Sequence, residues 1–116
     1  MKYSYDFAVI EGKIPMIEFL DGLSVRERAK VFANIDKLIE LKELGIQPKE
    51  NLSKAVGYGI FELRVHFESR IARSFYFYEN KRRIIFTHGF IKKTDRTPKQ
   101  EIERAKRIAG EWREIT

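Results

Sequence analysis

The sequence predicts an α+β domain with helices packed on one face of a sheet. Three observations predict this class: apolar and polar residues alternate at the N-terminus, apolar residues then recur at three- and four-residue steps, and three β-rich runs follow. The predicted order is strand, helix, helix, three strands, helix. The 116 residues fit one domain, and 43% hydrophobic residues are enough to form a core, so we expect a single domain over residues 1–116.

An N-terminal strand is predicted from a sequence period of two. The apolar residues Tyr3, Tyr5, Phe7 and Val9 alternate with Lys, Ser, Asp and Ala. Successive side chains of a strand point to opposite faces of the sheet. The alternation therefore indicates a strand that is buried on one side.

Two helices are predicted next, joined by a tight turn. Pro15 suits the first position of a short helix that ends at Gly22. Ser24 and Glu27 have the spacing of a capping box, in which each side chain binds the backbone N–H of the other residue. Apolar residues at helical spacing continue to a stop at Gly45. The second helix is therefore about 30 Å long and forms a helical hairpin with the first.

The second half is predicted to hold a three-stranded antiparallel meander and a last helix. Residues 45–59 contain one proline, three glycines and few apolar residues, which predicts a loop over the surface. The runs 60–67, 72–78 and 84–91 have the pattern of strands and are joined by short polar connectors. Thr97 is an N-cap that is followed by a proline, and it starts a helix with one apolar face.

The net charge of +6 belongs to the second half of the chain. Residues 1–59 hold nine basic and nine acidic residues, whereas residues 60–116 hold 14 basic and eight acidic ones. A one-sided cationic field attracts polyanions such as RNA, DNA or an acidic protein. The alternative is a solubilising surface that has no ligand.

The composition also excludes several classes of protein. No apolar run has the roughly 20 residues that a membrane-spanning helix needs, and the N-terminus lacks the apolar core of a secretory signal. Without Cys, the chain has no disulfide, no thiolate nucleophile and no Cys-ligated zinc. We therefore expect a cytoplasmic protein that does not contact membranes.

A basic cluster is predicted on one face of the sheet. Because side chains alternate along the first strand of the meander, Arg64 and His66 share the face opposite the one under the helices. A tight turn after them sets Arg73 opposite or near Arg64, on a face that is expected to be open. A phosphodiester fits there, because guanidinium groups bind phosphate oxygens with paired hydrogen bonds. The alternative is that Arg64 pairs with Glu62 or Glu68 as an ordinary exposed cation.

A second basic group lies where the last strand leads into the last helix. Lys92, Lys93, Arg96 and Lys99 gather there, next to a helix N-terminus whose N–H groups favour anions. This coincidence predicts a site that binds phosphate or RNA, although lysines at a strand end also protect against aggregation. His88, in the same strand, is interpreted as a hydrogen-bonded core or edge histidine and not as an acid or base.

Metal and nucleophile chemistry have no support in the motifs. The two His residues lack a nearby carboxylate pair, which makes a poor metal site. Ser69 and Ser74 lie outside the Gly-Xaa-Ser-Xaa-Gly setting of a serine nucleophile. No Gly-rich loop links a strand to a helix, so we expect no cofactor and no metal.

The motifs GIFELR at 59–64, RSFY at 73–76 and THGFIKKT at 87–94 occur in this order along the chain. Together they resemble the RelE/ParE toxin superfamily, and most closely its HigB-like branch of phage-derived toxins. The resemblance covers nearly the whole chain and implies a RelE-like fold, a single toxin domain of a type II toxin–antitoxin system. It also implies a cognate antitoxin, expected to be a small helix-turn-helix protein, and cleavage of mRNA in the ribosomal A site.

Carried over by position, the resemblance implies catalytic roles for Arg64, His66, Arg73 and Lys93. The implied reaction is attack by an RNA 2′-hydroxyl on the adjacent phosphate, with release of a 5′-hydroxyl and without a metal. The two arginines would stabilise charge on the phosphate, and His66 would transfer a proton. A lysine of the 92–93 pair would hold the phosphate or assist the leaving group.

The resemblance leaves the proton donor and acceptor open. Some relatives carry a Tyr or His in or after the C-terminal helix, and residues 102–116 contain neither. Two other functions are therefore kept as alternatives. One is a ParE-type toxin that inhibits DNA gyrase by binding, and the other is a non-toxic module that binds nucleic acid or a protein partner.

Overall fold

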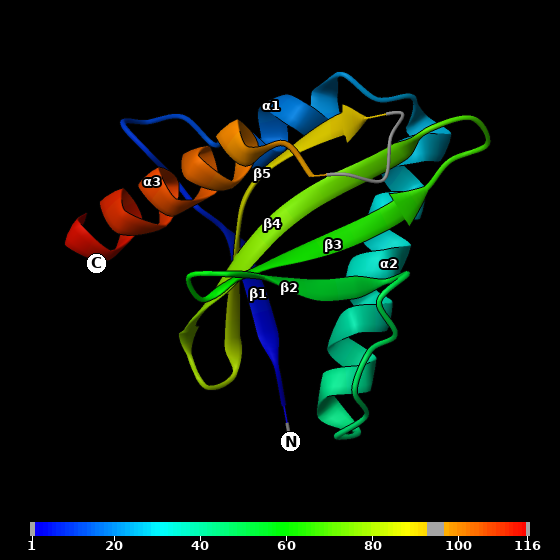
Figure 1. Cartoon of the computed structure of the whole chain (residues 1–116), viewed down its shortest axis with the longest axis horizontal. Helices are drawn as coiled ribbons and strands as arrows, with labels where there is room; N and C mark the ends of the chain where they lie inside the picture. The colour runs from blue at the N-terminus through cyan, green and yellow to red at the C-terminus, as the bar shows by residue number, and fades with distance from the viewer. Residues whose placement is uncertain (1, 93–96, 116) are drawn as a thin grey trace.

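The computed structural model describes residues 2–92 and 97–115, and within them the chain forms five strands and three helices (Figure 1). In chain order the elements are β1 (Ser4–Phe7), α1 (Pro15–Asp21), α2 (Val25–Glu43), β2 (Ser53–Gly57), β3 (Ile60–His66), β4 (Ile71–Asn80), β5 (Arg83–Lys92) and α3 (Lys99–Ile115). The predicted α+β class is therefore confirmed.

The five strands form one mixed sheet in the order β1-β5-β4-β3-β2. β2, β3, β4 and β5 are antiparallel neighbours, and β1 lies parallel to β5 at the opposite edge. The strands predicted over 60–67, 72–78 and 84–91 correspond to β3, β4 and β5. The prediction of a three-stranded meander is nevertheless wrong in number, because β2 lies within the predicted loop 45–59 and adds a strand.

The sequence pattern does not predict β2, because contacts with residues outside the segment hold this strand in place. Its backbone pairs with β3, beginning with Ser53 opposite Leu63. Ser53 is buried, and its hydroxyl lies 2.7 Å from the Tyr76 hydroxyl on β4. These partners lie outside the segment, and Tyr76 is 23 residues from Ser53, so the short run 53–57 carries no local sign of a strand.

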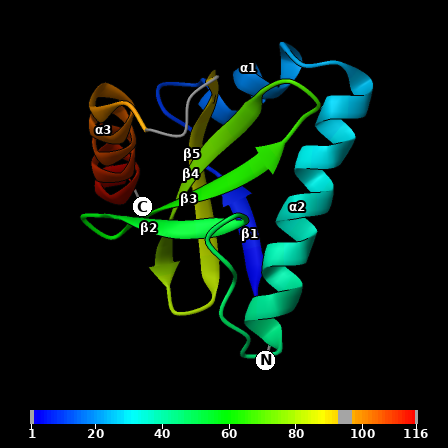
Figure 2. The ribbon, with the colours of Figure 1, turned by 45° about the vertical axis from the view of Figure 1, so that its right-hand side comes forward.

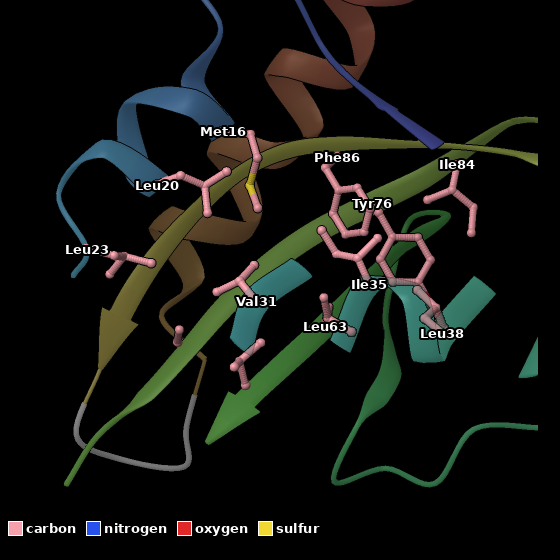
Figure 3. Close-up of a cluster of buried hydrophobic side chains, with 12 residues drawn as sticks. Met16, Leu20, Leu23, Val31, Ile35, Leu38, Leu63, Tyr76, Ile84 and Phe86 are labelled. Carbon is pink, nitrogen blue, oxygen red and sulfur yellow. The ribbon is translucent and has the colours of Figure 1, made fainter. Parts of the chain in front are cut away.

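The helices α1 and α2 cover one face of the sheet. Their buried side chains Met16, Leu20, Ile35 and Leu38 pack on Leu63 of β3 and other strand residues (Figure 3). This is the face that the alternation along β3 predicts for the helices. Burial of each large aliphatic side chain contributes on the order of 1.5–3 kcal/mol, so this cluster is a main source of stability.

The helix α3 covers the opposite face, with the sheet between it and α2 (Figure 2). Ala105, Ile108 and Trp112 pack there on Phe75 and Phe77 of β4. The prediction that all helices lie on one face is therefore wrong. The physical reason is that β4 and β5 carry consecutive apolar residues, which need cover on both faces of the sheet.

Local sequence signals set the ends and the close packing of the first two helices. The capping box of α2 is present, with the Glu27 N–H donating to Ser24 Oγ and the Ser24 N–H donating to the Glu27 carboxylate. Gly45 follows the C-cap of α2 with a φ of 71°, a conformation that favours glycine. A Cβ atom at Gly89 would collide with the Phe19 ring, so this glycine lets α1 approach β5.

α2 is the longest helix, with 19 residues. In the part of the chain that the structure describes, no helix combines the length and the apolar character required to cross a bilayer.

Candidate functional site

The carboxylate of Glu62 lies at the centre of a buried polar cluster between the sheet and the start of α3. Arg64 Nε lies 2.6 Å and Arg73 Nη1 lies 2.7 Å from the same oxygen, Glu62 Oε1. The Thr97 hydroxyl donates to the second oxygen, Glu62 Oε2. The cluster therefore joins two strands of the sheet to the residues that lead into α3.

The register of the β3–β4 hairpin explains why the two arginines meet. Arg64 lies directly opposite Arg73, as the tight turn between the strands predicts. Like charges at opposite positions of two strands repel. Glu62 lies two residues before Arg64 on the same face and accepts from both guanidinium groups, so its negative charge lies between the two positive ones.

The prediction that this face is open is wrong at Arg73. The side chains of Arg73 and Glu62 are both 0% exposed, whereas that of Arg64 is 17% exposed. Thr97, whose hydroxyl lies 3.4 Å from Arg73 Nη1, contributes to this cover. Arg73 is therefore enclosed inside the protein, and an RNA phosphate has no access to it in this conformation.

His66 and Lys92 lie one position further along the same face. His66 pairs with Ile71, and Ile71 pairs with Lys92 on β5, so the three side chains share the face of Arg64. His66 and Lys92 are separated by two strand spacings, which is roughly 10 Å. We call the end of the sheet formed by Arg64, His66 and Lys92 the basic end; His66 is exposed there, and Arg64 and Lys92 are half-buried.

The basic end lies outside the area that α3 covers. α3 packs at the other end of the strands, on residues that include Ile60 and Phe77. His66 is exposed, and one ring N–H donates to the backbone carbonyl of Asn51 at 3.1 Å. This bond orients the ring, and the other ring nitrogen has no hydrogen-bond partner among the residues that the structure describes.

Of the remaining residues that the sequence predicts to bind phosphate, only Lys99 lies among the described residues. Lys93 and Arg96 lie outside the described residues. Lys99 is exposed and is the first residue of α3. The nearby Glu101 lies in the first turn of that helix.

The structure brings together Arg64, Arg73, His66 and Lys92 at one end of the sheet, although the Arg73 side chain is buried.

His88 is a buried histidine that stays neutral, which confirms the interpretation as a hydrogen-bonded core residue. Burial lowers its pKa to about 3, and the positive charges of Arg104 and Arg107 act in the same direction. Its Nδ1 lies 3.1 Å from Thr87 Oγ1, and its Nε2 lies 3.3 Å from Glu101 Oε1. His88 therefore connects β5 to α3 and does not face a substrate.

Metal-binding geometry is absent from the described residues. Within 2–92 and 97–115, no group of three or more His, Asp or Glu side chains is arranged to hold a metal ion. The candidate chemistry at the basic end rests on guanidinium, imidazole and ammonium groups.

The sequence of the chain is similar to that of a known protein family. The model of the phage-derived Gp49-like protein family (DUF891) matches residues 18–109, which is most of the chain. The chain belongs to the Gp49-like family. This family is associated with RelE-like toxins. Among curated proteins, no match to the chain is found.

The central position of Glu62 in this Gp49-like protein is not predicted from the sequence. The sequence predicts Glu62 only as one of two alternative partners for Arg64, whereas the structure places it between Arg64 and Arg73. The signal was present in the strand period, because Glu62 shares the face of Arg64. The contact between Thr97 and Glu62 cannot be predicted from the sequence pattern, since the two residues are 35 positions apart.

Proposed function

We propose that this Gp49-like protein is the toxin of a type II toxin–antitoxin pair and cleaves mRNA in the ribosomal A site without a metal. The observation that supports this most is the basic end: Arg64, held by a buried carboxylate, lies on the same face as His66 and Lys92. The family association with RelE-like toxins supports the same proposal. The expected biological effect is inhibition of translation.

The proposed reaction is an internal transfer at one phosphate of the RNA. The 2′-oxygen attacks the phosphorus while its proton passes to a base, and the bond from phosphorus to the 5′-oxygen breaks. An acid gives a proton to that leaving oxygen, which yields a 2′,3′-cyclic phosphate and a 5′-hydroxyl. The step requires positive charge near the phosphate and a group that moves protons.

Arg64 has the geometry to stabilise the phosphate. Its Nε donates to Glu62 and its Nη1 to the Glu50 carbonyl at 3.3 Å, which fixes the guanidinium plane. The Nη2 group has no protein acceptor among the residues that the structure describes, and it is the part proposed to bind a phosphate oxygen. Because the guanidinium is fixed before RNA binds, little reorganisation is needed.

His66 and Lys92 complete the proposed site. His66 is the proposed proton-transfer group, because its imidazole is exposed and its ring nitrogens can both accept and donate a proton. Lys92 is proposed to hold the phosphate as a point charge. Arg73 is assigned a supporting role: from its buried position it orients Glu62, and Glu62 in turn orients Arg64.

The proposed partners are the ribosome with its mRNA and a cognate antitoxin, a small helix-turn-helix protein. An acidic antitoxin segment over the basic end would neutralise Arg64 and Lys92 and exclude RNA. Co-expression of the neighbouring open reading frame should then restore growth.

Expression of the chain from an inducible promoter tests the proposal. Pulse labelling should show a fall in translation. The mRNA should be cleaved before any DNA damage is seen. The variant Arg64→Ala should abolish the effect, and Arg82→Ala, which changes an exposed arginine in the β4–β5 turn, should retain it. DNA damage with intact translation would support a gyrase inhibitor instead, and unchanged growth would support a non-toxic binding module.

A further inference from the structure

An apolar groove lies between the C-terminal half of α2 and the chain that connects α2 to β2. Its volume is about 350 Å³, within the size range of ligand-binding clefts. Leu41 of α2 forms one wall, and Ile46 and Leu52 of the connecting chain form the other. In Figure 2 the connecting chain runs back beside α2 from its lower end.

The walls of this groove are fixed by hydrogen bonds before any partner binds. The Ile46 N–H donates to the Leu41 carbonyl at 2.8 Å, which joins the connecting chain to α2. The Leu52 carbonyl accepts from the Arg64 N–H at 2.8 Å, which joins the other end to β3. A preformed site loses less conformational entropy when it binds.

The groove leaves apolar surface in contact with water. Ile46 is 51% exposed, and the adjacent Leu44 is 64% exposed. Covering this surface would stabilise a complex by about 25 cal/mol for each Å² of apolar area removed from water. A partner that fills the groove therefore needs a bulky apolar side chain.

The rim of the groove carries positive charge. Lys37 and Lys49 line it, and no carboxylate in the described part of the chain does. Neither lysine forms an ion pair with any residue in the described ranges 2–92 and 97–115. Glu50 follows Lys49 in sequence but does not line the groove. The complementary partner surface is therefore apolar at its centre and acidic at its margins.

We propose that this groove binds an acidic segment of a protein partner, with a bulky aliphatic side chain between Lys37 and Lys49. The inference concerns this surface alone and does not depend on the RNA cleavage proposed above, because the basic end is a different surface. A second copy of the chain is a poorer fit, since it also carries a net charge of +6. RNA is a poorer fit as well, because the walls offer few polar groups to its bases and sugars.

Designed peptides test the chemistry of the proposed partner on the full chain. The first probe is a fluorescein-labelled peptide of about 15 residues with Leu at helical spacing and Glu at the flanking positions. One matched peptide replaces each Leu by Ser, and another replaces each Glu by Lys. We expect fluorescence anisotropy to show saturable binding of the first probe and at least roughly tenfold weaker binding of the other two.

Protein variants test the location of the site. Ile46→Asp and Lys37→Glu should each weaken binding of the first probe by about tenfold. Val25→Asp changes a residue that is 76% exposed at the other end of α2, and Lys81→Glu changes an exposed lysine of the β4–β5 turn. Both controls should bind as the unaltered chain does, and circular dichroism should show that all four variants are folded.

Several outcomes would overturn the inference. They are equal binding of the three peptides, binding of none of them, and folded Ile46→Asp and Lys37→Glu variants that bind as the unaltered chain does. A dimer in size-exclusion chromatography that Ile46→Asp converts to a monomer would identify a second copy as the occupant. Displacement of the first probe by a short ribo-oligonucleotide would identify RNA.

Discussion

Arg73 Nη1 lies 2.7 Å from Glu62 Oε1, and neither side chain is exposed to solvent. A charged pair in such a position is expensive to remove from water and is maintained only when its remaining polar atoms have partners. Glu62 also accepts from Arg64 and from the Thr97 hydroxyl, so its carboxylate is well satisfied. The pair therefore anchors the start of α3 while it holds Arg64 at the edge of the protein.

This relationship divides the predicted arginine site into two parts. Arg73, at the inside, is neutralised by Glu62, whereas Arg64 is partly exposed and has a fixed guanidinium plane. The sequence predicts the same role for the two arginines, but in the structure only Arg64 is accessible to a ligand.

Removal of the Glu62 charge should destabilise the fold. Glu62→Gln removes the carboxylate charge beside the buried Arg73 guanidinium, which should lower the free energy of unfolding by about 3–5 kcal/mol. Urea denaturation measures this. Glu103→Gln is the control, because Glu103 forms an exposed pair with Lys106 and should cost less than about 1 kcal/mol. Equal stability of the two variants would contradict the structural role of Glu62.

Two glycine substitutions should have opposite effects on stability. Gly89→Ala places a Cβ atom against the Phe19 ring and should cost about 1–3 kcal/mol. A Cβ atom added at Gly110 in α3 meets no other part of the protein within 4 Å. Because alanine favours a helix more than glycine does, Gly110→Ala should stabilise the protein by about 0.5–1 kcal/mol. Thermal unfolding measures both effects. The double variant Phe19→Leu/Gly89→Ala should regain part of the loss if the collision is its cause.

His88 should make stability fall as the pH falls. Its pKa is lowered to about 3 in the folded protein and is about 6.5 in the unfolded chain, so the unfolded state binds the proton first. The contribution is complete above about pH 6.5 and is lost between that pH and about pH 3, by at most about 1.4 kcal/mol per pH unit. Urea denaturation from pH 7 to 4 measures the slope.

Two variants separate His88 from other titrating groups. His88→Gln should reduce the slope of stability against pH over this window, whatever its effect on stability at pH 7. Asn51→Ala changes an exposed side chain that has no titratable group, so it should leave the slope as it is. A slope that His88→Gln does not alter would show that other groups dominate acid unfolding.

His66→Gln should lower RNA cleavage while the fold is retained. The amide can still donate to the Asn51 carbonyl, but it does not transfer protons, so the cleavage rate on programmed ribosomes should fall by about 10²–10⁴-fold. Asn51→Ala is the matched control, because the bond to His66 uses the backbone carbonyl and survives the change. Undiminished cleavage by His66→Gln would assign the proton transfer to another group.

Much of the local structure could be predicted because short-range physics decides it. The capping box of α2, its end before Gly45 and the alternation along β3 each depend on residues within a few positions. The pairing of Arg64 with Arg73 followed as well, since a short connector leaves the β3–β4 hairpin few registers.

The sequence by itself determined which residues form most of the helices and strands, and that Arg64 and His66 share one face. Only the tertiary structure decided that β2 joins the sheet, that α3 covers the face opposite α2, and that Arg73 is enclosed while Arg64 is not. The physical reason is that these features depend on contacts between distant residues, such as Thr97 with Glu62. Local periodicity shows that a strand must be covered on both faces, but it does not show which segment provides the cover.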